Sequence, residues 1–124
     1  MMGGDYKDLV VWQKAFELVL AIYRESAHFP SDEKYGPTIQ LRRAGVSIVS
    51  NIAEGQGRCS TGEFLHHLSF SLGSLKEVET QLLVANELKY LKQNQFARLM
   101  AMVAEVGRLI TGLSKSLRSS TTNH

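Results

Sequence analysis

The chain has 124 residues, of which 44% are hydrophobic and 21% are charged, and its formal net charge is +2. This length favours one domain that buries its own core without a disulfide or a metal, and the composition is ordinary for a soluble globular protein. A net charge this small does not by itself indicate a nucleic-acid, membrane or acidic partner.

The chain opens with a polar segment, residues 1–8, which we expect to be a flexible N-terminus. The first helix is predicted from about Leu9 to His28, with Asp8 as its N-cap and Phe29-Pro30 as its end. Its early apolar run, residues 9–12, is too short for a secretion signal or a membrane span. The single cysteine, Cys59, leaves no intramolecular disulfide, which suits a reducing compartment, so we predict a cytoplasmic protein that does not bind membranes.

Three further helices follow in the apolar pattern. The second begins near Pro37 and ends at Gly55-Gln56-Gly57, since proline suits a first turn and glycine suits a helix end. The third begins at Ser60, which forms a capping box with Glu63, and continues to about Tyr90. The fourth runs from Asn94 to about Leu117, and the polar tail 119–124 is predicted to be disordered.

No segment alternates with the period of a strand, so the fold class is all-α. Four helices of this length with short connections predict an antiparallel up-down-up-down four-helix bundle over residues 9–118. The first two helices are each apolar over about 200°, more than the roughly 100° that a bundle helix buries. This excess apolar surface predicts a homo-oligomer.

The second helix carries an arc of short polar and amide side chains rather than a lysine and glutamate face. On the third helix, Glu79 falls at the centre of the predicted apolar stripe, where an unpaired carboxylate costs several kcal/mol. Arg42 is its expected partner and Arg43 the next candidate. Such a group is either a ligand site or a buried ion pair that fixes helix register, and we favour the ion pair. The predicted structural network is Gln40, Arg42, Arg43, Asn51, Glu54, Glu77 and Glu79.

Two Glu-x-x-His motifs, at residues 25–28 and 63–66, are typical of four-helix bundle enzymes that bind two iron ions. Both lie on polar helix faces and at opposite ends of the predicted bundle, about 30 Å apart, so we predict no metal site. Adjacent His66 and His67 are interpreted as surface or boundary residues, and Cys59 as a cysteine without a nucleophilic role. We therefore predict no catalytic residue, no cofactor and no small-molecule substrate.

The last third of the chain is basic, because residues 88–124 hold six basic side chains against Glu105 alone. These cations either meet phosphate or an acidic protein surface, or they complement helix C-termini and solubilise a helix. The predicted nucleic-acid contacts are Lys89, Lys92, Arg98, Arg108, Lys115 and Arg118.

The chain resembles the four-helix bundle protein family whose founding members are encoded by intervening sequences within bacterial large-subunit ribosomal RNA genes. The resemblance is carried, over most of the chain, by residues 9–15, Phe29-Pro30 with Glu33 and Tyr35-Gly36, 40–44 with Ser47-Ile48, 51–55, and 73–75 with Glu77 and Glu79. Pro37 departs from the leucine that members usually carry. The resemblance implies a homopentamer around a central channel, without established enzymatic activity. The chain is also distantly similar to the accessory variability proteins of retroelements, which engage a reverse transcriptase and nucleic acid. Together these features predict a non-catalytic pentameric binding module for RNA or a ribonucleoprotein, with a protein–protein scaffold as the alternative.

Overall fold

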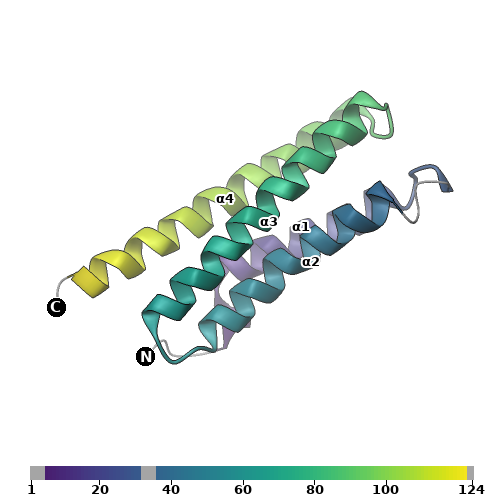
Figure 1. The fold of residues 1–124 in the computed structure, drawn as a ribbon. Helices are drawn as coiled ribbons and strands as arrows, with labels where there is room; N and C mark the ends of the chain where they lie inside the picture. Colours follow the sequence, from purple (N-terminus) through teal and green to yellow (C-terminus); the bar gives the residue numbers. More distant parts are fainter. Residues whose placement is uncertain (1–4, 32–35, 123–124) are drawn as a thin grey trace.

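The computed structural model describes residues 5–31 and 36–122, and every regular element in that part of the chain is a helix. A short 3-10 turn, η1 (Tyr6–Asp8), precedes four α-helices. These are α1 (Val10–Ser26), α2 (Pro37–Gln56), α3 (Thr61–Glu87) and α4 (Gln93–Thr122). They pack lengthwise as a four-helix bundle (Figure 1), which confirms the predicted all-α fold.

The helix ends follow local chemistry. Pro37 occupies the first turn of α2, where its missing N–H has no partner to lose. The Ser60 hydroxyl accepts a hydrogen bond of 3.1 Å from the Glu63 N–H and so caps α3. Asp8 is not the cap of α1, because it belongs to η1, and Leu9 takes the cap position without a side-chain bond. Residues 32–35, including Glu33 and Tyr35, lie outside the described residues.

Helical structure extends into both segments that were expected to be flexible. Asp5 and Asp8 form a reciprocal capping box around η1, with bonds of 3.2 Å from Lys7 N–H to Asp5 and 3.3 Å from Asp5 N–H to Asp8. At the other end, α4 continues through residue 119 to Thr122, because no glycine or proline follows Gly112 to stop it. Residues 1–4 and 123–124 of the predicted termini lie outside the described residues.

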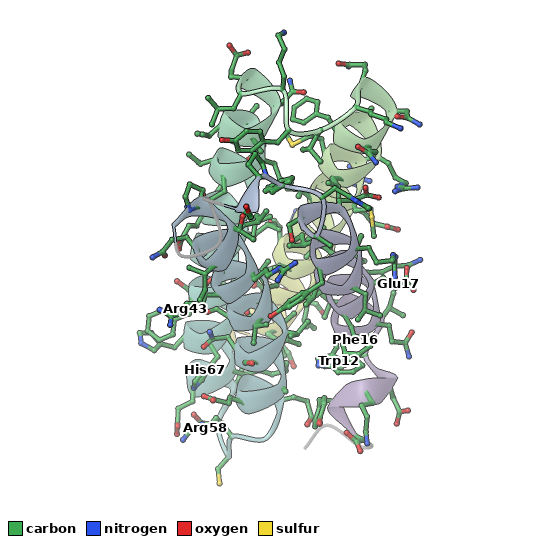
Figure 2. The ribbon with its side chains drawn as sticks, turned by 90° about the vertical axis from the view of Figure 1, so that its right-hand side faces the viewer. Trp12, Phe16, Glu17, Arg43, Arg58 and His67 are labelled. Atoms are coloured by element: carbon green, nitrogen blue, oxygen red, sulfur yellow. The ribbon has the colours of Figure 1, made fainter. Side chains whose placement is uncertain are left out.

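The four α-helices stand at the corners of a square in cross-section. α2 and α4 each contact both α1 and α3, so α1 is diagonal to α3 and α2 is diagonal to α4. The bundle therefore has an α1/α2 face, an α2/α3 face, an α3/α4 face and an α1/α4 face. Figure 2 looks onto α1 and α2, with α3 and α4 behind them. In Figure 1 both termini and the α2–α3 turn lie at one end of the bundle, and the α3–α4 turn lies at the other.

The core fills the space between the four helices with aliphatic side chains. A methyl group on Gly45 would lie 3.3 Å from Ile22 Cδ1, and one on Gly107 would lie 3.3 Å from Leu75 Cδ2, so these glycines let neighbouring helices approach closely. No helix in the described part of the chain is long and apolar enough to cross a bilayer. The largest fully buried apolar side chains are Leu18, Ile22, Leu41, Ile48, Ile52, Leu68, Leu82, Leu99, Ile110, Val78 and Val106.

Candidate functional site

A network of short polar side chains joins α2 to α3. Asn51 Nδ2 donates to Ser47 O at 2.9 Å and to Ser47 Oγ at 3.2 Å, and Ser74 Oγ donates to Ser47 Oγ at 2.8 Å. His67 Nδ1 lies 3.1 Å from Asn51 Oδ1. Because that oxygen can only accept, the proton of this bond sits on His67 Nδ1. The bonds tie the two helices together at half-buried positions, where each satisfied polar group avoids a desolvation penalty.

The network depends on a close approach at Gly55. A methyl group on Gly55 would lie 2.8 Å from both His67 Cβ and Phe64 Cδ1, closer than real methyl contacts. Glycine is therefore needed for α3 to pack against the end of α2. Beside it, the exposed Glu54 lies 3.9 Å from both His67 Nδ1 and Arg58 Nη2.

Arg42 bonds to α1 rather than to α3. Its Nε donates to Ser26 Oγ at 2.8 Å, its Nη2 donates to the Tyr23 carbonyl at 3.2 Å, and its guanidinium carbon lies 4.6 Å from the centre of the Tyr23 ring. Arg42 thus fastens α2 to the last turn of α1. The structure contradicts the predicted Arg42–Glu79 ion pair.

Glu79 is half-exposed and pairs with Lys76 at 3.7 Å, one turn back on α3. The buried side of α3 is centred between Leu75, Val78 and Leu82, so Glu79 lies at its edge, toward α4. The predicted stripe was centred too near Glu79 because it included the half-buried Leu72 and the exposed Leu83. A carboxylate at this position remains solvated and needs no buried partner.

The remaining members of the predicted network stand apart. Gln40, Arg43 and Glu77 are exposed, and none of their side chains has a bonding partner within residues 5–31 and 36–122. In Figure 2, Arg43, Arg58 and His67 lie on the α2/α3 side, and Trp12, Phe16 and Glu17 lie on α1. Of the predicted set, the structure brings only Asn51 and Glu54 to the α2–α3 contact.

Sequence reasoning missed the α3 half of this contact. His67, Ser71 and Ser74 recur at i, i+4 and i+7, which is a helical stripe of polar side chains between the core and the surface. Ser71 is fully buried, and its hydroxyl donates to the Ile48 carbonyl of α2 at 2.9 Å. The i, i+4, i+7 spacing of these small polar side chains is the sequence feature that could have predicted the contact with α2.

The residues considered for catalysis have structural partners or lie in solvent. Glu25 pairs with Arg98 across α1 and α4, and Glu63 belongs to the start of α3. His28 and Cys59 are exposed. Within the described residues, no cluster of three or more histidine, cysteine, aspartate or glutamate side chains could hold a metal ion.

The predicted nucleic-acid residues do not form one patch within a single chain. Lys89 and Lys92 lie at the α3–α4 turn, where Lys89 has a left-handed φ of 64°. Arg98 is tied to Glu25. Arg108 and Lys115 lie seven residues apart on one exposed side of α4, about 10 Å along the helix. Arg118, near the end of α4, is also exposed.

Arg108 also lines a groove of about 610 Å³ between α3 and α4. The groove has an apolar floor that includes Leu75 and Val103, and Lys76 and Glu79 stand on its α3 side. Its α4 side is formed by small residues next to Arg108, namely Ala104, Gly107, Thr111 and Gly112. Arg108 and Lys115 have no acidic partner among the described residues, so their charge is available to an external ligand.

Comparison with known proteins places these features in one family. The family model described as the 23S rRNA-intervening sequence protein matches residues 7–112. A crystal structure from Bacteroides thetaiotaomicron, of a protein with unknown function from the S23 ribosomal protein family, superposes with a TM-score of 0.80. It is 25% identical in sequence, and the match covers 88% of this chain and 98% of that one. No curated protein matches this chain.

Proposed function

Because the chain belongs to the 23S rRNA-intervening sequence protein family, we propose that it is a non-catalytic binding module that assembles as a homopentamer in the cytoplasm and binds RNA or a ribonucleoprotein. The two parts of this proposal, assembly and RNA binding, rest on different surfaces of the bundle.

Assembly is supported by the apolar area that the single chain leaves in solvent. Among the described residues, nine large hydrophobic side chains are at least 40% exposed, and four of them lie on α1. Burial of such side chains between copies contributes about 25 cal/mol per Å². They are Val10, Phe16, Leu20, Tyr23, Val46, Phe70, Leu83, Val84 and Leu88.

RNA binding is supported by one observation above the others, the exposed side of α4. Arg108 and Lys115 project there without acidic partners, and Ala104 and Thr111 beside them are small. Small neighbours let a phosphate backbone come close to the two cations, and assembly repeats the pair in every copy.

The test is salt-dependent binding of a short mixed-sequence RNA. We expect the assembled protein to bind at low salt, with log Kobs falling linearly against log salt concentration. Removing both cations in Arg108→Ala/Lys115→Ala should reduce that slope by about 0.7 for each lost single-strand phosphate contact and weaken binding at low salt.

The matched control is Lys7→Ala/Lys14→Ala, which removes the same charge from residues that already pair with Asp5 and Glu17. We expect this control to bind RNA with the wild-type slope. Equal loss in both double variants, or no RNA retention by the wild type at low salt, would contradict RNA binding through α4.

The alternative is a protein–protein scaffold, which the apolar floor of the α3/α4 groove favours. Under this alternative, the charge-reversal variant Arg108→Glu/Lys115→Glu captures its protein partner as well as the wild type does. Protein capture that survives the charge reversal, in a wild type that binds no RNA at low salt, would favour the scaffold, whereas loss of RNA on charge reversal would support RNA binding through α4.

A further inference from the structure

The groove between α3 and α4 combines an apolar floor with two opposite charges. α3 and α4 run side by side in Figure 1, and the groove between them has a volume of about 610 Å³, which is in the range of pockets that hold small ligands. Its floor includes Leu75 and Val103, while Glu79 stands on the α3 side and Arg108 on the α4 side. One ligand could therefore meet an apolar surface, a hydrogen-bond acceptor and a cation together.

Small residues on α4 keep the groove open. Gly107 packs closely against α3, since a methyl group added there would lie 3.3 Å from Leu75 Cδ2. Gly112 lines the same groove, but a methyl group added to it would meet nothing within 4 Å. Glycine destabilises a helix interior relative to alanine. Packing within the chain therefore explains Gly107, whereas at Gly112 the missing side chain leaves space in the groove.

Both charged groups of the groove are available to a ligand. Arg108 is exposed and has no acidic partner in residues 5–31 and 36–122. Glu79 pairs with Lys76 at 3.7 Å on its own helix. The Lys76 side chain is 71% exposed, so solvent weakens this pair and the carboxylate can exchange it for another donor.

The packing of Gly107 on Leu75 also sets the offset between the two charges. Glu79 follows Leu75 by one turn of α3, about 6 Å along the helix. Arg108 comes directly after Gly107, which packs on Leu75. The carboxylate and the guanidinium therefore stand on opposite sides of the groove, offset by roughly one helical turn.

These three groups match the parts of an unpaired nucleotide. A guanidinium binds phosphate, and an aliphatic floor covers the flat face of a base. A carboxylate repels phosphate, but its two oxygens accept hydrogen bonds from the N–H groups of a base. Guanine presents two adjacent donors of this kind, N1–H and the N2 amino group, on its Watson–Crick edge. That edge is paired in a duplex and is free only in a single strand.

We propose that the α3/α4 groove binds a guanine base of single-stranded RNA, with Glu79 accepting hydrogen bonds from the base and Arg108 binding an adjoining phosphate. This inference rests on the proposed RNA binding and names the kind of RNA that the site selects. RNA fits better than a protein segment because Lys115 continues the line of cations along α4 beyond the groove, about 10 Å from Arg108. A line of cations suits a chain with a negative charge on every unit.

The test is the affinity for a short oligouridine strand with one central guanosine, measured by fluorescence anisotropy at low salt. The same strand with a central adenosine or inosine is the comparison, since inosine lacks the N2 amino group and so removes one donor. We expect the guanosine strand to bind at least about fivefold more tightly than the adenosine strand, with the inosine strand between them. Duplexes of the guanosine and adenosine strands should bind equally well, because pairing covers the edge that Glu79 reads.

Two variants separate base recognition from phosphate binding. Glu79→Gln replaces one acceptor oxygen by an amide, so we expect it to abolish the preference for guanosine and to keep the wild-type salt slope. The matched control is Glu77→Gln, which removes the same charge from an exposed α3 carboxylate outside the groove and should keep the preference. Gly112→Leu fills the groove and should weaken the guanosine strand at least about fivefold without changing the slope, because Arg108 and Lys115 remain. Circular dichroism should show unchanged helical content in all three.

Three results would overturn the inference while leaving RNA binding through α4 intact. They are equal binding of the guanosine and adenosine strands by the wild type, a preference that survives Glu79→Gln or Gly112→Leu, and an equal loss of preference in Glu77→Gln. Any of them would leave the groove to the protein partner of the scaffold alternative. Failure of the wild type to bind any of the RNA strands at low salt would overturn the proposed RNA binding as well.

Discussion

In the segment from Asn51 to Gly55, two residues have a clear structural role in the contact between α2 and α3. Asn51 bridges Ser47 and His67, and the missing side chain of Gly55 allows α3 to come close enough for that bridge. A larger residue at Gly55 would displace Phe64 and His67 together. The segment is therefore a helix–helix contact whose residues join α2 to α3.

We predict that Gly55→Ala lowers the free energy of unfolding by about 1–3 kcal/mol, because a well-packed contact must open to admit the methyl group. Gly57→Ala is the control, since its added methyl group would lie 3.6 Å from the nearest atom and its backbone is already helical, so we expect a change within about 0.5 kcal/mol. Denaturant unfolding at one protein concentration measures both. Equal stability of the two variants would contradict the close approach at Gly55.

At the scale of the elements, the sequence predicts the helices better than the contacts between them. Pro37, Ser60 and Gly57 are local signals, and the helices begin or end within a few residues of them. Which face of α3 is buried depends on where α2 and α4 lie, and that information is not local. Glu79 was therefore misplaced, and Arg42 was assigned to α3 although it bonds to α1.

The hydrogen bonds of Arg42 to α1 predict that Arg42 and Glu79 contribute differently to the free energy of unfolding. Arg42→Ala removes hydrogen bonds to the buried Ser26 hydroxyl and the Tyr23 carbonyl, and should destabilise the protein by about 1–3 kcal/mol. Glu79→Ala removes an exposed pair with Lys76 and should change stability by less than about 0.5 kcal/mol. Thermal unfolding of the two variants at matched concentration makes the comparison. A larger effect from Glu79→Ala would restore the ion pair predicted from the sequence.

For the whole molecule, the surfaces divide the proposed roles among the helices. The α1/α2 face carries the stacked Trp12 and Phe16 rings with the exposed Tyr23, and α4 carries Arg108 and Lys115 without acidic partners among the described residues. A chain with a net charge of +2 has a weak field, and the proposed assembly would multiply that field and bury exposed apolar side chains. The proposed RNA binding therefore depends on the proposed self-assembly.

The most direct test of self-assembly is the mass of the purified 124-residue chain in solution, measured by sedimentation equilibrium. The proposed pentamer predicts a single species of about five times the 13.8 kDa chain mass, stable on dilution through the micromolar range. A monomer of one chain mass throughout that range would contradict the account.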